Sequence, residues 1–245
     1  KLLLQRKALP CPGVYDALSA RMVEYCGFQA CQISGFGVSA SSLGMTDASF
    51  TSLEEIVRIT SNIVRAVDIP VMTDADTGYG NAVNVWWTTK RLEETGAAGM
   101  NLEDQCFPKR CGHMAGKQLI SLGEMVGKIR AAVDAKRDPD FVINARTDAA
   151  YVCGIEEAIR RGNAYLEAGA DMVFVESPAS AEEVKRAIEQ IKGPVSINML
   201  EGGRTPMLTF EELRQLGAAR VSCPMFTSLI AAYALQKGLS YLMEH

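Results

Sequence analysis

Apolar runs alternate with amphipathic stretches along the whole chain. Four segments pass from a helical pattern through a glycine into an apolar run: EYCGFQACQIS, EETGAAGMNLE, LEAGADMVFVE and RQLGAARVSCP. The glycines are Gly27, Gly96, Gly169 and Gly217. Each can take the left-handed conformation that ends a helix, and the residues after it can start a strand. The pattern predicts a repeated unit of helix, tight turn and strand.

Four more segments complete the series of predicted strands. PVMTDAD, FVINARTD and PVSINML are apolar runs of strand length, and ALPCPGVYD is a weaker one near the start. About eight short strands that alternate with helical segments are typical of an α/β fold of the (β/α)8, or TIM-type, barrel. No linker or low-complexity tract divides the sequence, so we expect a single barrel domain over residues 1–245.

A doubly wound open sheet is the alternative fold, because it also alternates strand and helix. The phosphate-binding pattern GxGxxG follows none of the predicted strands. The pairs Gly35/Gly37 and Gly78/Gly80 are only weak signs of an anion-binding loop. The barrel is therefore the preferred prediction.

Polar side chains gather where the predicted strands end. In a closed barrel these carboxyl ends meet at one mouth, so residues distant in sequence become neighbours around a pocket. Any one strand-end carboxylate can equally cap a helix or pair with a surface cation. As a group they predict a functional pocket, and Asp74 and Asp76, two apart in an extended strand, should face the same side. The residues are Asp74, Asp76, Glu103, Asp104, Arg146, Asp148, Glu176 and Asn198.

Several carboxylates around one pocket repel one another unless a cation or a shared proton intervenes. Oxygen ligands suit Mg²⁺ or Mn²⁺, and magnesium commonly takes only one or two carboxylates directly. We expect Asp74 to be the direct ligand, with Asp76 and Glu103 held through water; Asp47 is either a helix cap or a further acid. Zinc is the competing metal, but the spacing of Cys106, Cys111 and His113 matches no zinc-finger pattern.

The segment EDQCFPKRCGH concentrates charged and reactive groups in a predicted loop. Cys111 is flanked by Lys109, Arg110 and His113, and cationic neighbours favour the thiolate. Such a thiol can exchange a proton near neutral pH, although a buried, inert cysteine is the alternative interpretation. The segment SGFGVSASSLGMTD offers backbone N–H groups that can hold a carboxylate, or it is an ordinary loop.

Composition narrows the classes of partner. The chain has 245 residues, 48% of them hydrophobic, and a formal net charge of −4. The sequence shows no clustered Lys and Arg of the kind that bind phosphate backbones, so we expect a small-molecule partner rather than nucleic acid. Seven cysteines without CxxC spacing indicate thiols in a reducing cytoplasm. No apolar run reaches the roughly 20 residues of a membrane span, and no signal peptide is evident.

The segments KRCGH after EDQ, DADTG, ARTD and SGFGVSASSLG resemble the isocitrate lyase/phosphoenolpyruvate mutase superfamily over essentially the whole chain. The nearest resemblance is to its small lyases, which act on 2,3-dimethylmalate or 2-methylisocitrate. This resemblance implies an Mg²⁺-dependent carbon–carbon lyase that cleaves a 2-hydroxy dicarboxylate, such as 2,3-dimethylmalate, to pyruvate and propionate by retro-aldol or Claisen-type chemistry. It also implies a homotetramer that exchanges a C-terminal helix, which we expect to lie outside residues 1–245.

The resemblance further implies roles for individual residues. Mg²⁺ would bind at Asp74, with Asp47, Asp76 and Glu103 completing the site through water. Ser34, Gly35 and Phe36 would hold the 2-oxo acid end of the substrate. The catalytic set would be Arg146, which pairs with a substrate carboxylate, and Lys109, Cys111 and His113 of a KRCGH lid in which Cys111 is the proton donor. Further substrate contacts would come from Asp76, Gly112, Glu176 and Asn198.

Two departures from the superfamily pattern affect the choice of substrate. Gln32 stands where lyases of isocitrate and methylisocitrate have Tyr, and Pro224 stands where oxaloacetate hydrolases tend to have Ser. The alternatives are, in order, a 2-methylisocitrate lyase, an oxaloacetate hydrolase or a phosphonate-forming mutase, and a barrel retained only for binding. The mutase branch generally lacks the KRCGH cysteine, so Cys111 argues against it.

Overall fold

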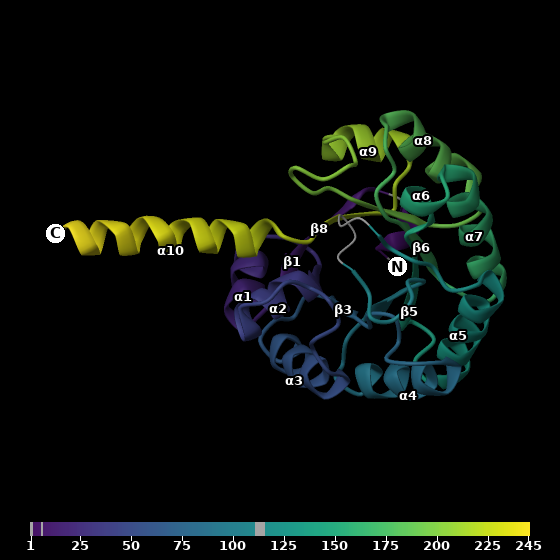
Figure 1. Cartoon of the computed structure of the whole chain (residues 1–245), viewed down its shortest axis with the longest axis horizontal. Helices are drawn as coiled ribbons and strands as arrows, with labels where there is room; N and C mark the ends of the chain where they lie inside the picture. Colours follow the sequence, from purple (N-terminus) through teal and green to yellow (C-terminus); the bar gives the residue numbers. More distant parts are fainter. Residues whose placement is uncertain (1, 6, 111–115) are drawn as a thin grey trace.

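Eight parallel strands close into a barrel in the computed structural model, which describes residues 2–5, 7–110 and 116–245. Each strand pairs with the next, and β1 pairs with β8 to complete the ring (Figure 1). This confirms the predicted (β/α)8 barrel and excludes the open sheet. The strands are β1 Leu9–Val14, β2 Cys31–Ile33, β3 Val71–Asp74, β4 Gly99–Glu103, β5 Val142–Thr147, β6 Met172–Val175, β7 Val195–Asn198 and β8 Arg220–Cys223.

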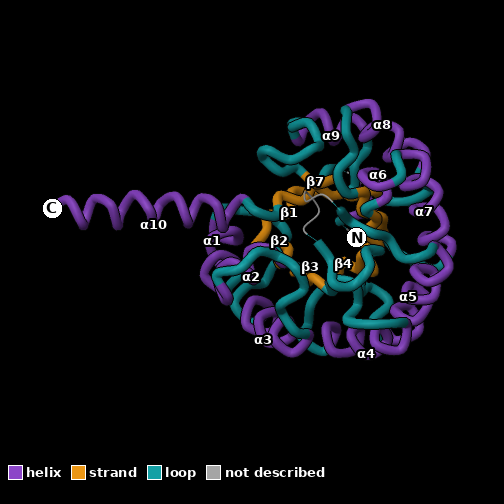
Figure 2. The backbone as a smooth tube through the Cα atoms, in the orientation of Figure 1, coloured by secondary structure: helices purple, strands orange, loops and turns teal. Residues whose placement is uncertain are grey.

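Helices surround the barrel on its outer side, as the tube in Figure 2 shows. The helices around the ring are α1 Ala17–Tyr25, α2 Gly35–Leu43, α3 Leu53–Val64, α4 Ala82–Glu93, α5 Leu122–Ala135, α6 Ala149–Val152, α7 Ile155–Glu167, α8 Ala181–Gln190 and α9 Phe210–Leu216. The 3-10 turn η1 Leu3–Gln5 precedes β1, and α10 Phe226–Glu244 follows β8.

Helix α3 illustrates why these segments are helical. The Ser52 hydroxyl accepts a hydrogen bond from the Glu55 backbone, and the Glu55 carboxylate accepts one from the Ser52 backbone, so both ends of a capping box are present. Ile56, Ile59 and Ile63 are spaced by three and four residues and are all buried. The helix therefore presents one apolar stripe to the barrel and a polar face outward.

The four glycines at the predicted helix-to-strand junctions all have positive φ angles. The values are +86° for Gly27, +85° for Gly96, +105° for Gly169 and +88° for Gly217. A residue with a Cβ is disfavoured in this region, so glycine allows the chain to leave each helix and enter the next strand directly. The sequence interpretation of these junctions is confirmed.

Alternation along the strands separates the core from the pocket. In β4, Met100 and Leu102 are fully buried in the apolar layer between strands and helices. Asn101 and Glu103 point to the other side, into the barrel, and line its pocket. One strand therefore contributes both packing and polar chemistry, and the same alternation recurs around the ring.

Helix α10 departs from the barrel and projects away from it, with the C-terminus at its far end (Figure 1). None of its residues is buried, although it carries exposed apolar side chains such as Ile230, Tyr233 and Leu239. We expected an exchangeable helix outside residues 1–245. That expectation stays a prediction. The described chain includes α10, whose first turn contacts β1 through Thr227 and whose remaining apolar side chains are largely exposed.

Two expectations from composition concern membranes and disulfides. Within the described residues, none of the helices combines the length and apolarity needed to span a membrane. The six described cysteines are all free thiols: Cys11, Cys26, Cys31, Cys106, Cys153 and Cys223.

Candidate active site

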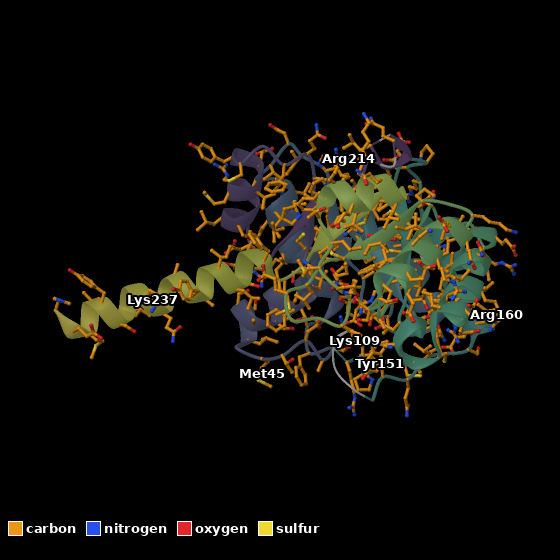
Figure 3. The ribbon with its side chains drawn as sticks, turned by 90° about the horizontal axis from the view of Figure 1, so that it is seen from above. Met45, Lys109, Tyr151, Arg160, Arg214 and Lys237 are labelled. Carbon is orange, nitrogen blue, oxygen red and sulfur yellow. The ribbon has the colours of Figure 1, made fainter. Side chains whose placement is uncertain are left out.

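A pocket opens at the carboxyl ends of the strands, where the sequence predicted it. Lys109 and Tyr151 lie toward this end of the barrel and Arg214 toward the other (Figure 3). The pocket walls come from loops and strand ends around the whole ring. The lining residues are Gln32, Ile33, Ser34, Gly35, Phe36, Asp47, Asp74, Asn101, Glu103, Lys109, Arg146, Phe174, Glu176, Asn198, Leu200, Ser222, Pro224 and Met225.

Asp74 and Asp47 lie next to each other beside Gly35. A Cβ on Gly35 would lie 2.4 Å from Asp74 Oδ2 and 3.1 Å from Asp47 Oδ2, so only glycine lets both carboxylates approach the start of α2. Asp74 ends β3, and Asp47 lies in the loop between α2 and α3. The structure thus brings together two acids that are far apart in the sequence.

Lys109 is the cation of this acidic cluster. Its side chain is 5% exposed, and Nζ lies 2.9 Å from Asp47 Oδ2 and 3.8 Å from Asp76 Oδ2. Burial alone would lower the pKa of Lys109, but Asp76, Glu103, Asp74 and Asp47 together hold this pKa well above its ordinary value. Lys109 therefore remains charged and partly neutralises the acids.

Asp76 corrects one step of the sequence interpretation. We expected Asp74 and Asp76 to face the same side of an extended strand, but β3 ends at Asp74, and Asp76 has φ of +51°. The Asp76 backbone N–H donates to Asp74 Oδ1 at 2.9 Å, and its carboxylate accepts from the Thr77 backbone. Asp76 lies behind the pocket lining, and burial raises its pKa against the opposing charge of Lys109.

Arg146 joins three carboxylates at the opposite wall. Its Nε lies 2.9 Å from Asp148 Oδ2 and 3.3 Å from Glu103 Oε2, and its Nη2 lies 3.1 Å from Glu176 Oε2. The guanidinium carbon also lies 5.2 Å from the centre of the Phe174 ring. Burial opposes the charge of Arg146, but these carboxylates hold its pKa well above the ordinary value.

Glu103 is the most perturbed carboxyl group in the pocket. Burial raises its pKa to about 8, although Arg146 and Lys109 act in the opposite direction. Its Oε1 atom is buried and has no hydrogen-bond partner within residues 2–5, 7–110 and 116–245. A buried carboxylate oxygen of this kind can accept a proton, a water or a cation.

Two buried carboxylates support the β5 end from behind. Asp148 forms an ion pair with Lys117 at 2.7 Å, and both side chains are fully buried. Lys117 thereby holds the Asp148 carboxylate in the place where it accepts a hydrogen bond from Arg146. Asp104 accepts hydrogen bonds from Tyr165 and Thr147 at 2.7 Å and from Arg161 at 3.1 Å. Strand-end acids here therefore divide into pocket residues and structural residues.

The start of α2 forms the wall opposite Arg146. Ser34 is the N-cap, and its hydroxyl accepts from the Gly37 backbone at 3.0 Å. The first residues of a helix present unpaired backbone N–H groups and a partial positive charge, which favour an anion. Ser34, Gly35 and Phe36 therefore offer the anion-binding backbone that the sequence suggested.

Glu176 and Asn198 meet at the end of β6 and β7. Asn198 Nδ2 donates to Glu176 Oε1 at 3.3 Å, and both side chains are buried at the pocket wall. The residues of the expected lid are only partly described. Lys109 lies in the pocket, whereas Cys111, Gly112 and His113 lie outside the described residues, so their predicted roles stay predictions.

The sequence did not single out Phe174 or Asn101, or the contact that Gln32 makes with Ser222. Phe174 lies two residues before Glu176 in β6, and Asn101 lies two residues before Glu103 in β4, so strand alternation could have found both. Gln32 Nε2 donates a short hydrogen bond to Ser222 Oγ, 190 residues away. The sequence carries no local signal for that pair, because it depends on β2 and β8 both lying beside β1.

The described oxygens fit a hard divalent cation. Asp47 and Asp74 carry carboxylates at one wall, and Glu103 leaves a buried oxygen without a partner, which are the donors that Mg²⁺ or Mn²⁺ prefers. Among the described residues, no three Asp, Glu, His or Cys side chains form a preassembled metal cage.

A parallel barrel with paired acids and a partly buried arginine at its mouth defines an enzyme that handles small anions. The family model described as phosphoenolpyruvate phosphomutase matches residues 1–243. The chain belongs to this family, within the isocitrate lyase/PEP mutase superfamily.

The chain is similar to several characterised members. It is 48% identical to 2,3-dimethylmalate lyase of Eubacterium barkeri, covering 96% of this chain and 81% of that protein. It is 43% identical to 2-methylisocitrate lyase of Aeropyrum pernix, and the match covers 100% of this chain and 78% of that protein. A solved structure of 2,3-dimethylmalate lyase superposes with a TM-score of 0.94 at 36% identity, covering 99% of this chain and 82% of that chain. A solved structure of oxaloacetate acetylhydrolase bound to 3,3-difluorooxalacetate superposes with a TM-score of 0.95 at 36% sequence identity. The match covers 100% of this chain and 84% of that chain.

Proposed function

We propose that this protein is a Mg²⁺-dependent carbon–carbon lyase that cleaves a 2-hydroxy dicarboxylate such as 2,3-dimethylmalate to pyruvate and propionate. The observation that carries the proposal is the pocket in which Asp47, Asp74 and Glu103 face Arg146 at one barrel mouth. The similarity to 2,3-dimethylmalate lyase supports the choice of substrate. The catalytic domain is residues 1–245, and free cysteines support a cytoplasmic location.

Asp74 would hold the cation directly, with Asp47, Asp76 and Glu103 held through water, and Mn²⁺ is a possible substitute. When bound, the ion supplies positive charge that orients the 1-carboxylate and the 2-oxygen of the substrate. Lys109 keeps the acids from repelling one another before the cation enters. The high pKa of Glu103 means that cation binding competes with a proton there.

The start of α2 and Arg146 would hold the two ends of the substrate. Backbone N–H groups of Gly35 and Phe36 bind the 2-oxo acid end, beside the Ser34 N-cap. Removal of the hydroxyl proton lets the C2–C3 bond break, and its electrons pass to C3 and the second carboxylate. Arg146 stabilises this developing charge. Glu176 and Asn198, in contact with each other, contribute the wall at that end.

Protonation of C3 completes the reaction. Cys111 of the KRCGH loop is the proposed donor, with Lys109, Gly112 and His113 as its neighbours in the loop. The proposal for Cys111, Gly112 and His113 rests on the resemblance, since these residues lie outside the described part of the chain. A thiol near several cations can change its protonation state near neutral pH.

A methylisocitrate lyase is the second candidate, and one observation separates the two. Methylisocitrate carries a third carboxylate, which needs a cation or several donors. Among the described residues, Lys109 and Arg146 are the cationic side chains of the pocket, and both already pair with carboxylates. This favours a substrate with two carboxylates. Pro224, which lines the pocket in place of a serine hydroxyl, favours cleavage over oxaloacetate hydrolysis.

We also propose a homotetramer in which α10 packs on a neighbouring subunit. An apolar groove beside the base of α10 is lined by Tyr15, Leu18, Met22, Phe28 and Ile230. The groove and the exposed apolar face of α10 lie on the same chain, so a second copy can satisfy both.

Product analysis tests the reaction most directly. The protein is incubated with 2,3-dimethylmalate, 2-methylisocitrate, citramalate or oxaloacetate, each with and without Mg²⁺, and the acids formed are identified by NMR. Pyruvate and propionate from dimethylmalate, formed only with the cation, are the expected result. Faster formation of succinate from methylisocitrate would favour the second candidate. No turnover of any of the four acids would favour a barrel retained for binding.

A further inference from the structure

Asn101 occupies the floor of the pocket between two neighbouring strands. In the strand register it lies beside Asp74 of β3 and Asn144 of β5. Register partners in a parallel sheet project to the same side, so Asn101 points into the barrel next to the proposed direct ligand of the cation. It also lines the pocket itself.

Two hydrogen bonds fix the orientation of the Asn101 amide. Its Oδ1 accepts from Asn144 Nδ2 at 2.6 Å and from Arg220 Nη1 at 3.3 Å. A guanidinium has only donors, so the atom facing Arg220 must be the oxygen, and the NH2 group must point the other way. Asn101 is only partly buried, and no described residue accepts a hydrogen bond from its Nδ2. The pocket floor therefore presents a donor that pairs with no residue in the described part of the chain.

Arg220 is an unusual residue for the interior of a barrel. It is 1% exposed at the start of β8, and its Nε and Nη2 atoms have no hydrogen-bond partner among the described residues. No described carboxylate forms an ion pair with it. Cys11 is its close neighbour, but burial raises the pKa of this thiol against the effect of Arg220, so Cys11 stays neutral.

A lone buried cation is costly to stability, because its hydration is lost and not replaced. The Arg220 guanidinium lies beneath a pocket lined by several carboxylates. Its hydrogen bond to Asn101 Oδ1 connects it to a residue of the pocket lining. A donor polarised by a neighbouring cation binds an anion more strongly than a neutral amide does.

We propose that Asn101 donates a hydrogen bond to the 2-oxo acid end of the substrate, and that Arg220 is the positioning residue that orients and polarises this amide. The assignment to that end follows from the register with Asp74, and it rests on the proposed lyase function. Arg146, nearer the mouth on β5, holds the other carboxylate. Loss of the Asn101 donor should therefore weaken binding of one product and spare the other.

The first test uses the two proposed products as separate probes. Binding of pyruvate and of propionate is measured with Mg²⁺ present, by calorimetry or ligand-observed NMR, for the wild type, Asn101→Leu and Ser196→Ala. Ser196 is the matched control, because it pairs in register with Arg220 and its buried hydroxyl has no partner. We expect Asn101→Leu to lower the affinity for pyruvate about tenfold or more, which is the usual cost of losing a hydrogen bond to a charged group.

The same variant should change propionate affinity by less than about twofold, and Ser196→Ala should change neither. Equal pyruvate affinity in Asn101→Leu and wild type would overturn the inference. So would an equal loss for both products, or an equal loss in Ser196→Ala, since either points to general disturbance of the barrel. If the wild type binds neither product and turns over no substrate, the proposed function fails along with the inference.

The second test separates positioning from structure at Arg220. Arg220→Met should lower the affinity for pyruvate to a similar extent. The melting temperature should stay equal or rise, because the substitution removes an unpaired buried charge. Adding Arg220→Met to Asn101→Leu should lower the pyruvate affinity by less than about a further twofold, because both residues act through the same Asn101 amide. Arg220→Lys should recover part of the affinity. Additive losses in the double variant, or a falling melting temperature with unchanged pyruvate affinity, would overturn the role of Arg220.

Discussion

Lys109 Nζ lies 2.9 Å from Asp47 Oδ2, which joins the loop after β4 to the loop after α2 across the pocket mouth. The two residues are 62 positions apart in the sequence. This contact puts an ammonium ion where several acids would otherwise face one another. The cation requirement of the site should therefore depend on Lys109.

Replacing Lys109 with Met should make the protein respond more strongly to Mg²⁺. The acids near Lys109 lose their internal counter-ion, so a divalent ion binds them more tightly and raises the melting temperature further. The measurement is the melting temperature over a Mg²⁺ titration. Lys136→Met is the control, because Lys136 pairs with Asp171 away from the pocket. An identical Mg²⁺ response in all three proteins would contradict the prediction.

Gly35→Ala should weaken cation binding about tenfold or more, the effect typical of a disturbed ligand shell. The added methyl group would meet Asp74 Oδ2 at 2.4 Å and would push the carboxylate out of place. Calorimetric titration with Mg²⁺ measures the change. Gly123→Ala, at an open position in α5, controls for the effect of alanine in a helix and should leave the affinity unaltered.

Lys117→Met should destabilise the fold by about 3 kcal/mol, because it leaves Asp148 buried with a weaker counter-charge. The pH dependence should change as well. Arg146 and Lys117 outweigh burial and hold the pKa of Asp148 below its ordinary value. The stabilisation by this pair is thus complete above about pH 4 and is lost as the pH falls through the lower folded-state pKa.

Urea unfolding of the wild type and Lys117→Met at pH 7 and at progressively lower pH measures both effects. The difference between the two proteins should shrink as the pH falls below about 4 and through the lowered pKa of Asp148 in the folded state. Lys185→Met on α8 is a surface control and should lie within about 0.5 kcal/mol of the wild type at every pH. A difference that stays constant down to acid pH would show that Asp148 is not the group responsible.

Cys111→Ser should leave product binding intact and reduce turnover about 100-fold or more, as expected for loss of a proton donor. Serine is close in size but gives up its proton far less readily near neutral pH. Single-turnover kinetics with dimethylmalate provide the measurement. Cys106→Ser, in the same loop region, should keep nearly full turnover; near-normal turnover in Cys111→Ser would remove that residue from the mechanism.

Ile230→Asp should reduce the assembly to smaller species, because it places a charge in the apolar groove beside the base of α10. Light scattering coupled to size-exclusion chromatography gives the mass in solution. Lys237→Glu, farther along the projecting helix (Figure 3), tests whether any new acidic residue has this effect and should leave the mass unchanged. The same mass for Ile230→Asp and the wild type would contradict packing of this helix between copies.

The barrel could be predicted from the sequence because its repeated signals are local. Gly96, for example, ends a helix and begins a strand within a few residues, and its positive φ matches that use. The convergence of Glu103, Arg146 and Glu176 also followed once a closed barrel was assumed, since parallel strands bring their carboxyl ends together.

Other features could not be predicted because they depend on exact strand ends or on distant partners. The orientation of the Asp76 side chain is one example. Strand β3 ends at Asp74, and Asp76 has a left-handed backbone conformation, so the alternation of side chains along a strand does not apply to it. Asp104 looked like a further pocket acid, yet Tyr165 and Arg161 hold it behind the wall. Its partners come from α7, far along the chain.

The pairing of β1 with β8 also sets an order of events during protein synthesis. Leu9–Val14 is synthesised before the other strands, but its strand partner Arg220–Cys223 follows only after all of them. Until then the ring has an open edge, and Gln32 has no Ser222 to contact. A nascent chain therefore carries every acid of the pocket before it can form the floor beneath them, and the ability to hold substrate arises only once β8 has been made.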